Sequence, residues 1–182
     1  VRLVSLGDKE NIDDETLYNL AKKSSGMQFS EEDIARMKSF SDSILRLYKE
    51  RKELANYLEI LVKEEMPNCS AVAGTLLAAR LLAHVGSLEK LSKLPSSTIQ
   101  LLGSEKALFR HMRNKRFKPP KYGILFAHPY IQQAPKNLKG KVARVIASKL
   151  SIAAKTDFFS KRDRSSQLRK ELEDEMKKLG IK

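Results

Sequence analysis

Apolar residues recur at helical spacing along most of the chain, most regularly in the stretch between Ser30 and Met66, which contains no Pro or Gly. Two series there repeat every seven residues: Met37, Ile44, Arg51 and Leu58, and Phe40, Leu47, Leu54 and Leu61. Only Arg51 interrupts this heptad pattern, which is typical of a coiled coil. The pattern predicts one long helix, and we favour a projecting coiled coil over a surface helix on a globular core.

Helix-capping residues place a shorter helix before the long one. Asn11 is followed by acidic residues, as at a helix start, and Gly26 suits a helix end. Ser30 and Asp33 resemble a capping box, with Asp in place of the usual Glu or Gln. A short helix followed at once by a long one predicts a helical hairpin over residues 1–66.

The pattern changes at Pro67, where we place a domain boundary. A Pro disfavours helix at the residue before it, and Asn68 can cap a new helix that runs to Gly86. Further helices are predicted over residues 106–112 and from about Lys139, and a buried extended or irregular segment over residues 122–127. The sequence therefore predicts an all-α protein: an antiparallel coiled coil over 1–66, a compact helical domain over 67–160, and a charged C-terminal helix over 161–182.

Two of these helices carry a basic face opposite an apolar one. In the helix over 106–112, Lys106, Arg110 and Arg113 share one side. We expect its other side, with Leu101, Leu108 and Met112, to be buried. In the last long helix we expect Val142, Ile146, Leu150 and Ala153 to face the core, opposite a second basic stripe of Lys141, Arg144, Ser148 and Lys155.

Charge makes these stripes more informative. The 182 residues include 35 Lys and Arg and 22 Asp and Glu, a net charge of +13. Residues 1–66 carry 11 basic and 14 acidic side chains, so all of the positive excess follows Pro67. Residues 106–121 hold seven basic side chains and no acidic one. Such asymmetry indicates contact with nucleic acid or another anionic surface, although a solvated charged face is the simpler alternative.

Several functional classes find no support in the sequence. No run approaches the roughly 18 apolar residues of a membrane span, and no secretory signal precedes the first helix. Cys69 is the single cysteine and there are three His, so we expect no disulfide and no structural metal. No phosphate-binding loop or catalytic signature is present, so we expect no cofactor and no enzyme activity.

An ordered series of short motifs over about 67–159 resembles the Nop domain. Its members are Ala78-Ala79-Arg80-Leu81, Ala83-His84, Gly86-Ser87-Leu88, Leu94 to Gln100, Leu102 to His111, Lys118 to Lys121, Gly123, His128-Pro129, Gly140-Lys141, Ala143-Arg144, Ala147, Lys149-Leu150 and Asp157. One departure concerns the family's Gly-Ala-Glu-Lys signature, which reads Gly103-Ser104-Glu105-Lys106 here. The predicted hairpin also fits the coiled coil of this family.

The resemblance implies a non-enzymatic core protein of a box C/D small ribonucleoprotein, in its archaeal form. Its expected partners are a box C/D guide RNA, the ribosomal-type protein that binds the kink-turn, a second copy of itself, and fibrillarin, through a domain that we expect this chain to lack. An archaeal member would be cytoplasmic and a eukaryotic one nucleolar.

The resemblance also implies roles for named residues. RNA contact is expected from Lys106, Arg110, His111, Arg113, Lys118 and Lys121. Contact with the kink-turn protein and RNA is expected from Gln100, Gly103, Ser104, Glu105 and Leu108, with free backbone N–H groups at Ser104, Glu105 and Lys106. Dimerisation is expected from Phe40, Ile44, Leu47, Leu54, Leu58 and Leu61.

Other interpretations remain open at this stage. His111 borders the apolar side of its helix, so it is either a structural histidine or one that stacks on a base. Glu105 at a helix start can simply complement the helix dipole. The whole chain can instead be a helical adaptor whose basic face meets an acidic protein, or the related spliceosomal factor.

Overall fold

The computed structural model describes residues 15–16, 19, 23 and 29–181, and every regular element in this part of the chain is helical. The prediction of an all-α protein is therefore confirmed. The first helix of the predicted hairpin lies for the most part outside the described residues. The chain divides into a unit that ends at Asn56 and a unit that begins at Tyr57.

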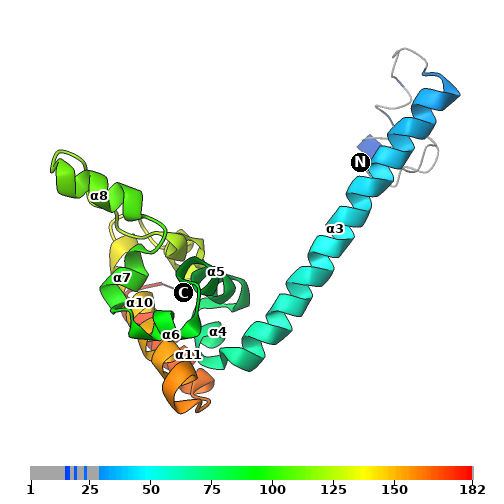
Figure 1. Cartoon of the computed structure of the whole chain (residues 1–182). Coiled ribbons are helices and arrows are strands. Elements are labelled where there is room, and N and C mark those ends of the chain that lie inside the picture. Colours follow the sequence, from blue (N-terminus) through cyan, green and yellow to red (C-terminus); the bar gives the residue numbers. More distant parts are fainter. Residues whose placement is uncertain (1–14, 17–18, 20–22, 24–28, 182) are drawn as a thin grey trace. The chain divides into compact units, whose positions relative to one another are not determined.

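The long predicted helix is present as α3, Glu31–Glu65, coloured blue to cyan-green in Figure 1. Its start is the capping box expected from the sequence. The Asp33 N–H donates to Ser30 Oγ at 3.2 Å, and the Ser30 N–H donates to Asp33 Oδ2 at 3.3 Å. Asp33 thus takes the place of the usual Glu, because the two reciprocal hydrogen bonds between Ser30 and Asp33 satisfy N–H groups that a helix start leaves without a partner.

The helix predicted from Asn68 to Gly86 is two helices, so that prediction is wrong. Pro67 is the first residue of α4, Pro67–Ala73, and α5 follows as Thr75–Val85. Gly74 lies between them with φ +81°, a left-handed conformation that a glycine adopts without strain. No single described helix is long and apolar enough to cross a membrane, and α4 and α5 meet that test only together, as a pair bent by 114°.

A buried carboxylate, rather than a neighbouring residue, caps the start of α4. Asp157 accepts hydrogen bonds from the Asn68 N–H at 3.1 Å, the Cys69 N–H at 2.9 Å and the Asn68 side-chain amide at 2.6 Å. The Asn68 amide also binds the Arg162 carbonyl and the Arg164 N–H, at 2.9 and 2.7 Å. Asn68 is therefore the centre of a buried polar network and not the N-cap expected from the sequence.

The helix α10, Lys139–Lys155, is the central element of the second unit. Its predicted core face is confirmed, since Val142, Ile146 and Ala153 are fully buried and Leu150 nearly so. It packs against α4, α6 (Leu88–Lys93), α7 (Ser96–Leu101) and α11 (Ser165–Lys178). Shorter turns complete the unit: η1 (Ile124–Ala127), α9 (Pro129–Gln133) and the π-helical η2 (Thr156–Ser160).

The C-terminal helix α11 is more than a charged surface helix. Leu168, Leu172 and Met176 follow one another at four-residue spacing and are almost completely buried in the same core as α10. Lys149 of α10 and Glu171 of α11 form an ion pair at 2.6 Å at the edge of this contact. The polar helix described from the sequence therefore has one apolar face, which the high density of charged residues obscured.

Candidate nucleic-acid interface

The basic cluster lies on α8, Glu105–Arg113, which projects from the body of the second unit (Figure 1). The structure contains the helix predicted over 106–112, but the expected burial of its apolar side is wrong. No residue of α8 is buried; Leu108 is half-buried and Met112 is 60% exposed. Phe109, which sequence analysis did not single out, is also 60% exposed. The amphipathic pattern is real, but no other element of the unit covers its apolar side.

The segments that enter and leave α8, residues 100–103 and 123–124, are hydrogen-bonded to each other and form a narrow neck. The Gly123 N–H donates to the Gln100 carbonyl at 3.2 Å, and the Ile124 N–H donates to the Leu102 carbonyl at 2.7 Å. A Cβ atom at Gly123 would lie 1.9 Å from the Leu102 carbonyl oxygen, so the two backbone segments of the neck are too close for any side chain at this position. Only glycine fits at this position.

Gln100 holds the returning loop. Its side-chain amide donates to the Lys121 carbonyl at 2.7 Å. This places Lys118 and Lys121, both exposed, in a loop whose end is fixed to α7 rather than free. Gln100, which the sequence places at the contact with the kink-turn protein and RNA, thus fixes the end of the loop that carries two of the predicted RNA-binding lysines.

The turn into α8 uses its own backbone donors internally. Gly103 has φ +80°, and its N–H donates to Glu105 Oε1 at 2.7 Å. The Ser104 N–H donates to the Leu101 carbonyl at 2.9 Å, and its hydroxyl donates to the same oxygen at 2.6 Å. The expectation of a free N–H at Ser104 is therefore wrong, because the tight turn directs that group back onto α7.

Glu105 has a second partner in the body of the unit. Its Oε1 atom lies 2.9 Å from Nε2 of His84, in the last turn of α5. Partial desolvation raises the pKa of Glu105, but the hydrogen bonds from Gly103 and His84 outweigh it and hold that pKa below its ordinary value. The carboxyl group is therefore charged at neutral pH and engaged within the chain.

The cationic side of α8 is free of acidic partners. Lys106, Arg110 and Arg113 are exposed, as are Lys115, Arg116, Lys118 and Lys121 in the following loop. Within the described part of the chain, none of these seven side chains forms an ion pair with a carboxylate. Elsewhere, by contrast, many cations are paired, as Lys93 is with Glu89. Seven unpaired cations give α8 and its loop a strongly positive electrostatic potential, which attracts anions.

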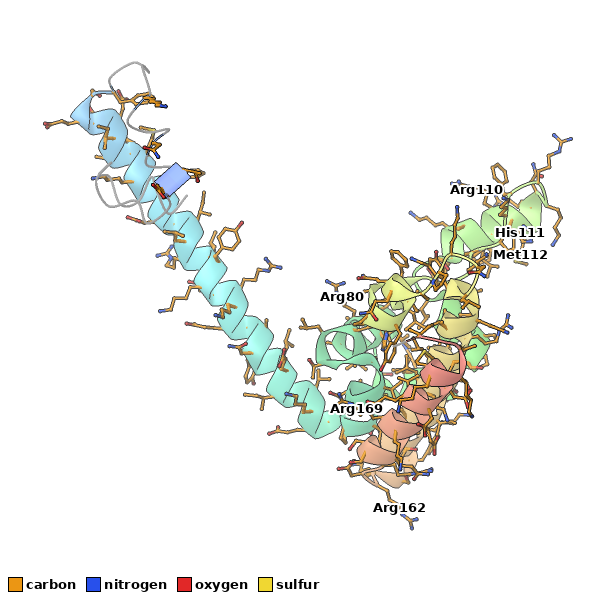
Figure 2. The ribbon with its side chains drawn as sticks, turned by 180° about the vertical axis from the view of Figure 1, so that it is seen from behind. Arg80, Arg110, His111, Met112, Arg162 and Arg169 are labelled. Atoms are coloured by element: carbon orange, nitrogen blue, oxygen red, sulfur yellow. The ribbon has the colours of Figure 1, made fainter. Side chains whose placement is uncertain are left out.

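Aromatic and histidine contacts order the far end of α8. The Arg110 guanidinium lies over the Phe117 ring, with 5.7 Å between its carbon and the ring centroid. His111 Nδ1 is hydrogen-bonded to the Phe117 carbonyl. Figure 2 shows Arg110, His111 and Met112 together on this projecting helix. The structure therefore gives His111 a role in folding the loop back onto α8, which is one of the two alternatives left open by the sequence.

A second basic stripe continues from the first. Lys141, Arg144, Ser148 and Lys155 are exposed along α10, as predicted. The side chain of Lys121 packs over the start of α10, where a Cβ atom at Gly140 would lie 3.5 Å from Lys121 Cδ. Lys121 thus joins the cations that follow α8 to those of α10, a connection that periodicity alone does not reveal.

The described residues hold no cluster of metal-binding side chains, and the single cysteine among them is buried. No group of three or more His, Cys, Asp or Glu in this part of the chain is placed to hold a metal ion. Burial raises the pKa of the Cys69 thiol, and the neighbouring Asp157 raises it further, which makes this cysteine a poor nucleophile. His128 is buried, with Nε2 3.0 Å from the Val72 carbonyl and Nδ1 accepting from the Tyr130 N–H.

The apolar heptad positions of α3 are largely open to solvent. Phe40, Leu47 and Leu54 are exposed by 60–70% and Leu58 by 44%. Ile44 and Leu61 are half-buried. A row of large apolar side chains on one helix is unusual on a free surface and indicates a contact with another helix.

The helical fold and the unpaired cations of α8 are the features expected of a protein that binds an anionic partner. The sequence identifies the family: residues 3–178 match the Nop family, described as "snoRNA binding domain, fibrillarin". The chain belongs to the Nop family. Because this family comprises ribonucleoprotein scaffold proteins and no enzymes, the prediction of a non-catalytic protein is confirmed.

Similar proteins agree with this assignment. A NOP5 family protein of Methanocaldococcus jannaschii is 50% identical over 138 residues, which cover 76% of this chain and 33% of that protein. Nucleolar protein 56 of Schizosaccharomyces pombe is 40% identical over 172 residues, or 85% of this chain and 34% of that protein. This chain thus spans about a third of the length of these relatives.

A solved structure supports the fold. A chain in the crystal structure of a fibrillarin/Nop5p complex matches 95% of this chain with a TM-score of 0.60 and 32% sequence identity, and the match covers 68% of that chain.

Proposed function

We propose that this chain is the RNA-binding and self-associating part of a box C/D ribonucleoprotein scaffold. It recognises a kink-turn in the guide RNA together with the ribosomal-type protein that binds the kink-turn. In this way it supports guide-directed 2'-O-methylation by fibrillarin, which the whole protein holds through another domain. Assembly takes place in the cytoplasm of an archaeal cell or the nucleolus of a eukaryotic one.

The observation that carries the proposal is the set of unpaired cations on α8 and its loop. Phosphate contacts dominate nucleic-acid affinity, and arginine can grip two phosphate oxygens at once. Lys106, Arg110 and Arg113 supply the first contacts, and Lys118 and Lys121 extend them. The basic stripe on α10 adds further phosphate contacts along the same RNA backbone.

The kink-turn protein meets the apolar side of α8. Phe109 and Met112 are exposed and Leu108 is only half-buried within this unit, although all three share one helix with the cations. A protein partner that binds the same RNA can cover them, with the turn at Gln100, Gly103 and Ser104 at the edge of the contact. RNA then binds one side of α8 and protein the other, which makes recognition depend on both.

Self-association uses α3. A helix that exposes Phe40, Leu47 and Leu54 in heptad register buries them by packing against another copy. Replacing Leu47, Leu54 and Leu61 by Gln should therefore produce monomers in light scattering, and Lys52→Gln, on the opposite side of the helix, should not. A wild-type chain that stays monomeric at high concentration would contradict this part of the proposal.

RNA binding is tested by its dependence on salt. A face with about five phosphate contacts should give a log–log slope of about −4 to −5, by analogy with DNA. Arg110→Ala should flatten that slope by about one and weaken binding to many RNA sequences alike, since phosphate contacts position rather than specify. The experiment includes the kink-turn protein, because the site is completed by both partners.

Arg162→Ala is the matched control. Arg162 is also an exposed arginine of the second unit, and it lies at the opposite end of that unit from α8 (Figure 2). Equal losses from the two substitutions would indicate diffuse attraction instead of a site. An Arg110→Ala protein that is folded by circular dichroism and binds as tightly as wild type would favour the protein adaptor over the RNA scaffold.

A further inference from the structure

The helix α8 is held to its unit by very little. It buries no residue, and the chain enters and leaves it through the neck at Gly103 and Gly123. The first residue of α8, Glu105, connects the helix to α5 through its side chain. Its Oε1 atom lies 2.9 Å from His84 Nε2 and accepts a hydrogen bond from the Gly103 N–H at 2.7 Å. This oxygen therefore joins α5, the turn and α8 at a single point.

Small rotations at that point move the cations a long way. At about 1.5 Å per residue, the nine residues of α8 extend roughly 13 Å, so a tilt of about 20° displaces the far end by roughly 4–5 Å. That displacement exceeds the reach over which a charge-assisted hydrogen bond forms. The direction of α8 thus decides whether Arg110 and Arg113 can meet phosphates together with the lysines at its base.

We propose that Glu105 is a positioning residue of this surface, and that its carboxylate latches α8 to α5 through His84 instead of contacting RNA itself. The latch concerns the direction of α8 in the free protein, and its effect on RNA binding rests on the function proposed above. Glu105 is the only acidic side chain of α8, at the base of an otherwise cationic helix. A direct contact between this carboxylate and phosphate would be repulsive.

The sign of the effect separates positioning from direct contact. If Glu105 acts on RNA only through its charge, Glu105→Ala removes a repulsive carboxylate and strengthens binding. If it is the latch, the same substitution weakens binding. Since the His84–Glu105 pair is partly exposed, with side-chain exposures of 38% and 46%, we expect a loss of about two- to fivefold, in the range of exposed ion pairs.

Conservative variants restore the latch without the charge. Glu105→Gln keeps an oxygen that accepts from both Gly103 and His84, and should bind RNA within about twofold of wild type. His84→Gln keeps a donor for Glu105, whereas His84→Ala does not. The double variant of His84→Ala and Glu105→Ala should bind no more weakly than Glu105→Ala alone, because that single substitution already removes the contact with His84.

The direction of α8 is measured without RNA. Nitroxide labels on Arg113→Cys in α8 and Lys155→Cys in α10 occupy exposed sites, and the native Cys69 is buried and should not be labelled. Pulsed electron resonance should give one narrow distance distribution with wild-type Glu105 and with Glu105→Gln. It should give a broad one with Glu105→Ala and with His84→Ala, at unchanged helix content.

The outcomes are distinct. Equal, narrow distributions in all four proteins would overturn the latch, and so would tighter RNA binding by Glu105→Ala. A broad distribution in Glu105→Ala with unchanged RNA affinity would overturn the positioning role. Failure of the wild-type chain to bind kink-turn RNA with its protein partner would refute the proposed function instead, while the distance measurement would still decide whether the latch exists.

Discussion

Removal of the Asp157 carboxylate should destabilise the second unit more than any surface change. Asp157 is only 4% exposed and accepts three hydrogen bonds at the start of α4. In Asp157→Ala the N–H groups of Asn68 and Cys69 lose their acceptor, and no residue of the preceding turn caps them. The Asn68 amide keeps its bond to the Arg162 carbonyl but loses the other.

The expected loss follows from these unmade bonds. A buried donor left without a partner costs about 1–3 kcal/mol, and loss of a helix N-cap costs about 0.5–2 kcal/mol by itself. Two buried backbone donors left without an acceptor therefore predict a loss of about 2–6 kcal/mol. Domains of this size are stable by only about 5–15 kcal/mol, so the variant should be close to unfolding at room temperature.

Urea denaturation followed by circular dichroism measures this loss. Asp157→Asn should be nearly as damaging, since its amide nitrogen would face the Cys69 N–H, donor against donor. Asp163→Ala is the control: that carboxylate is exposed and accepts from the Ser165 N–H at 2.9 Å, so its removal should change little. A loss below about 1 kcal/mol in Asp157→Ala would refute the reasoning, because water or a neighbouring group would then replace the carboxylate at almost no cost.

Three further predictions concern single residues of the second unit. Burial holds the pKa of His128 below its ordinary value of 6.5, so the unfolded chain binds a proton more readily than the folded one. Stability should therefore fall as the pH is lowered from about 7 to 5, and His128→Gln should show a smaller fall in urea titrations at these pH values. Gly123→Ala should prevent the neck from forming, since its Cβ would lie 1.9 Å from the Leu102 carbonyl; the amide spectrum of α8 should change or the chain should fail to fold, and a native spectrum would contradict this. Phe117→Ala should release Arg110 and weaken RNA binding by about two- to fivefold in anisotropy titrations, whereas Phe117→Tyr should keep the affinity.

Local chemistry made several elements predictable. The Ser30 and Asp33 pair marks the start of α3, because a capping box needs only residues three positions apart. The core face of α10 follows from apolar residues at helical spacing, and that helix is central enough for the whole face to be buried. The charge cluster after Lys106 was visible because it depends on composition alone.

Contacts between distant residues were not predictable in the same way. Asp157 and Asn68 are 89 residues apart, and nothing in either local pattern indicates that one caps the helix of the other. The bend at Gly74 was missed because an isolated glycine within an apolar run does not by itself reveal whether a helix continues. His84 and Glu105 lie 21 residues apart, and their pairing depends on how the turn at Gly103 directs α8 towards α5.

The apolar side of α8 shows where periodicity stops being informative. Leu108 and Met112 repeat at the spacing of a buried helix face, and the same spacing arises when the face is kept for a partner. The sequence cannot separate these cases, because a hydrophobic pattern says that a face is to be covered and not which molecule covers it. In this chain the neck carries α8 away from the core, and the described residues leave most of its apolar side exposed. An apolar side and a cationic side on one projecting helix are therefore the features to expect of a protein that recognises RNA and a second protein together.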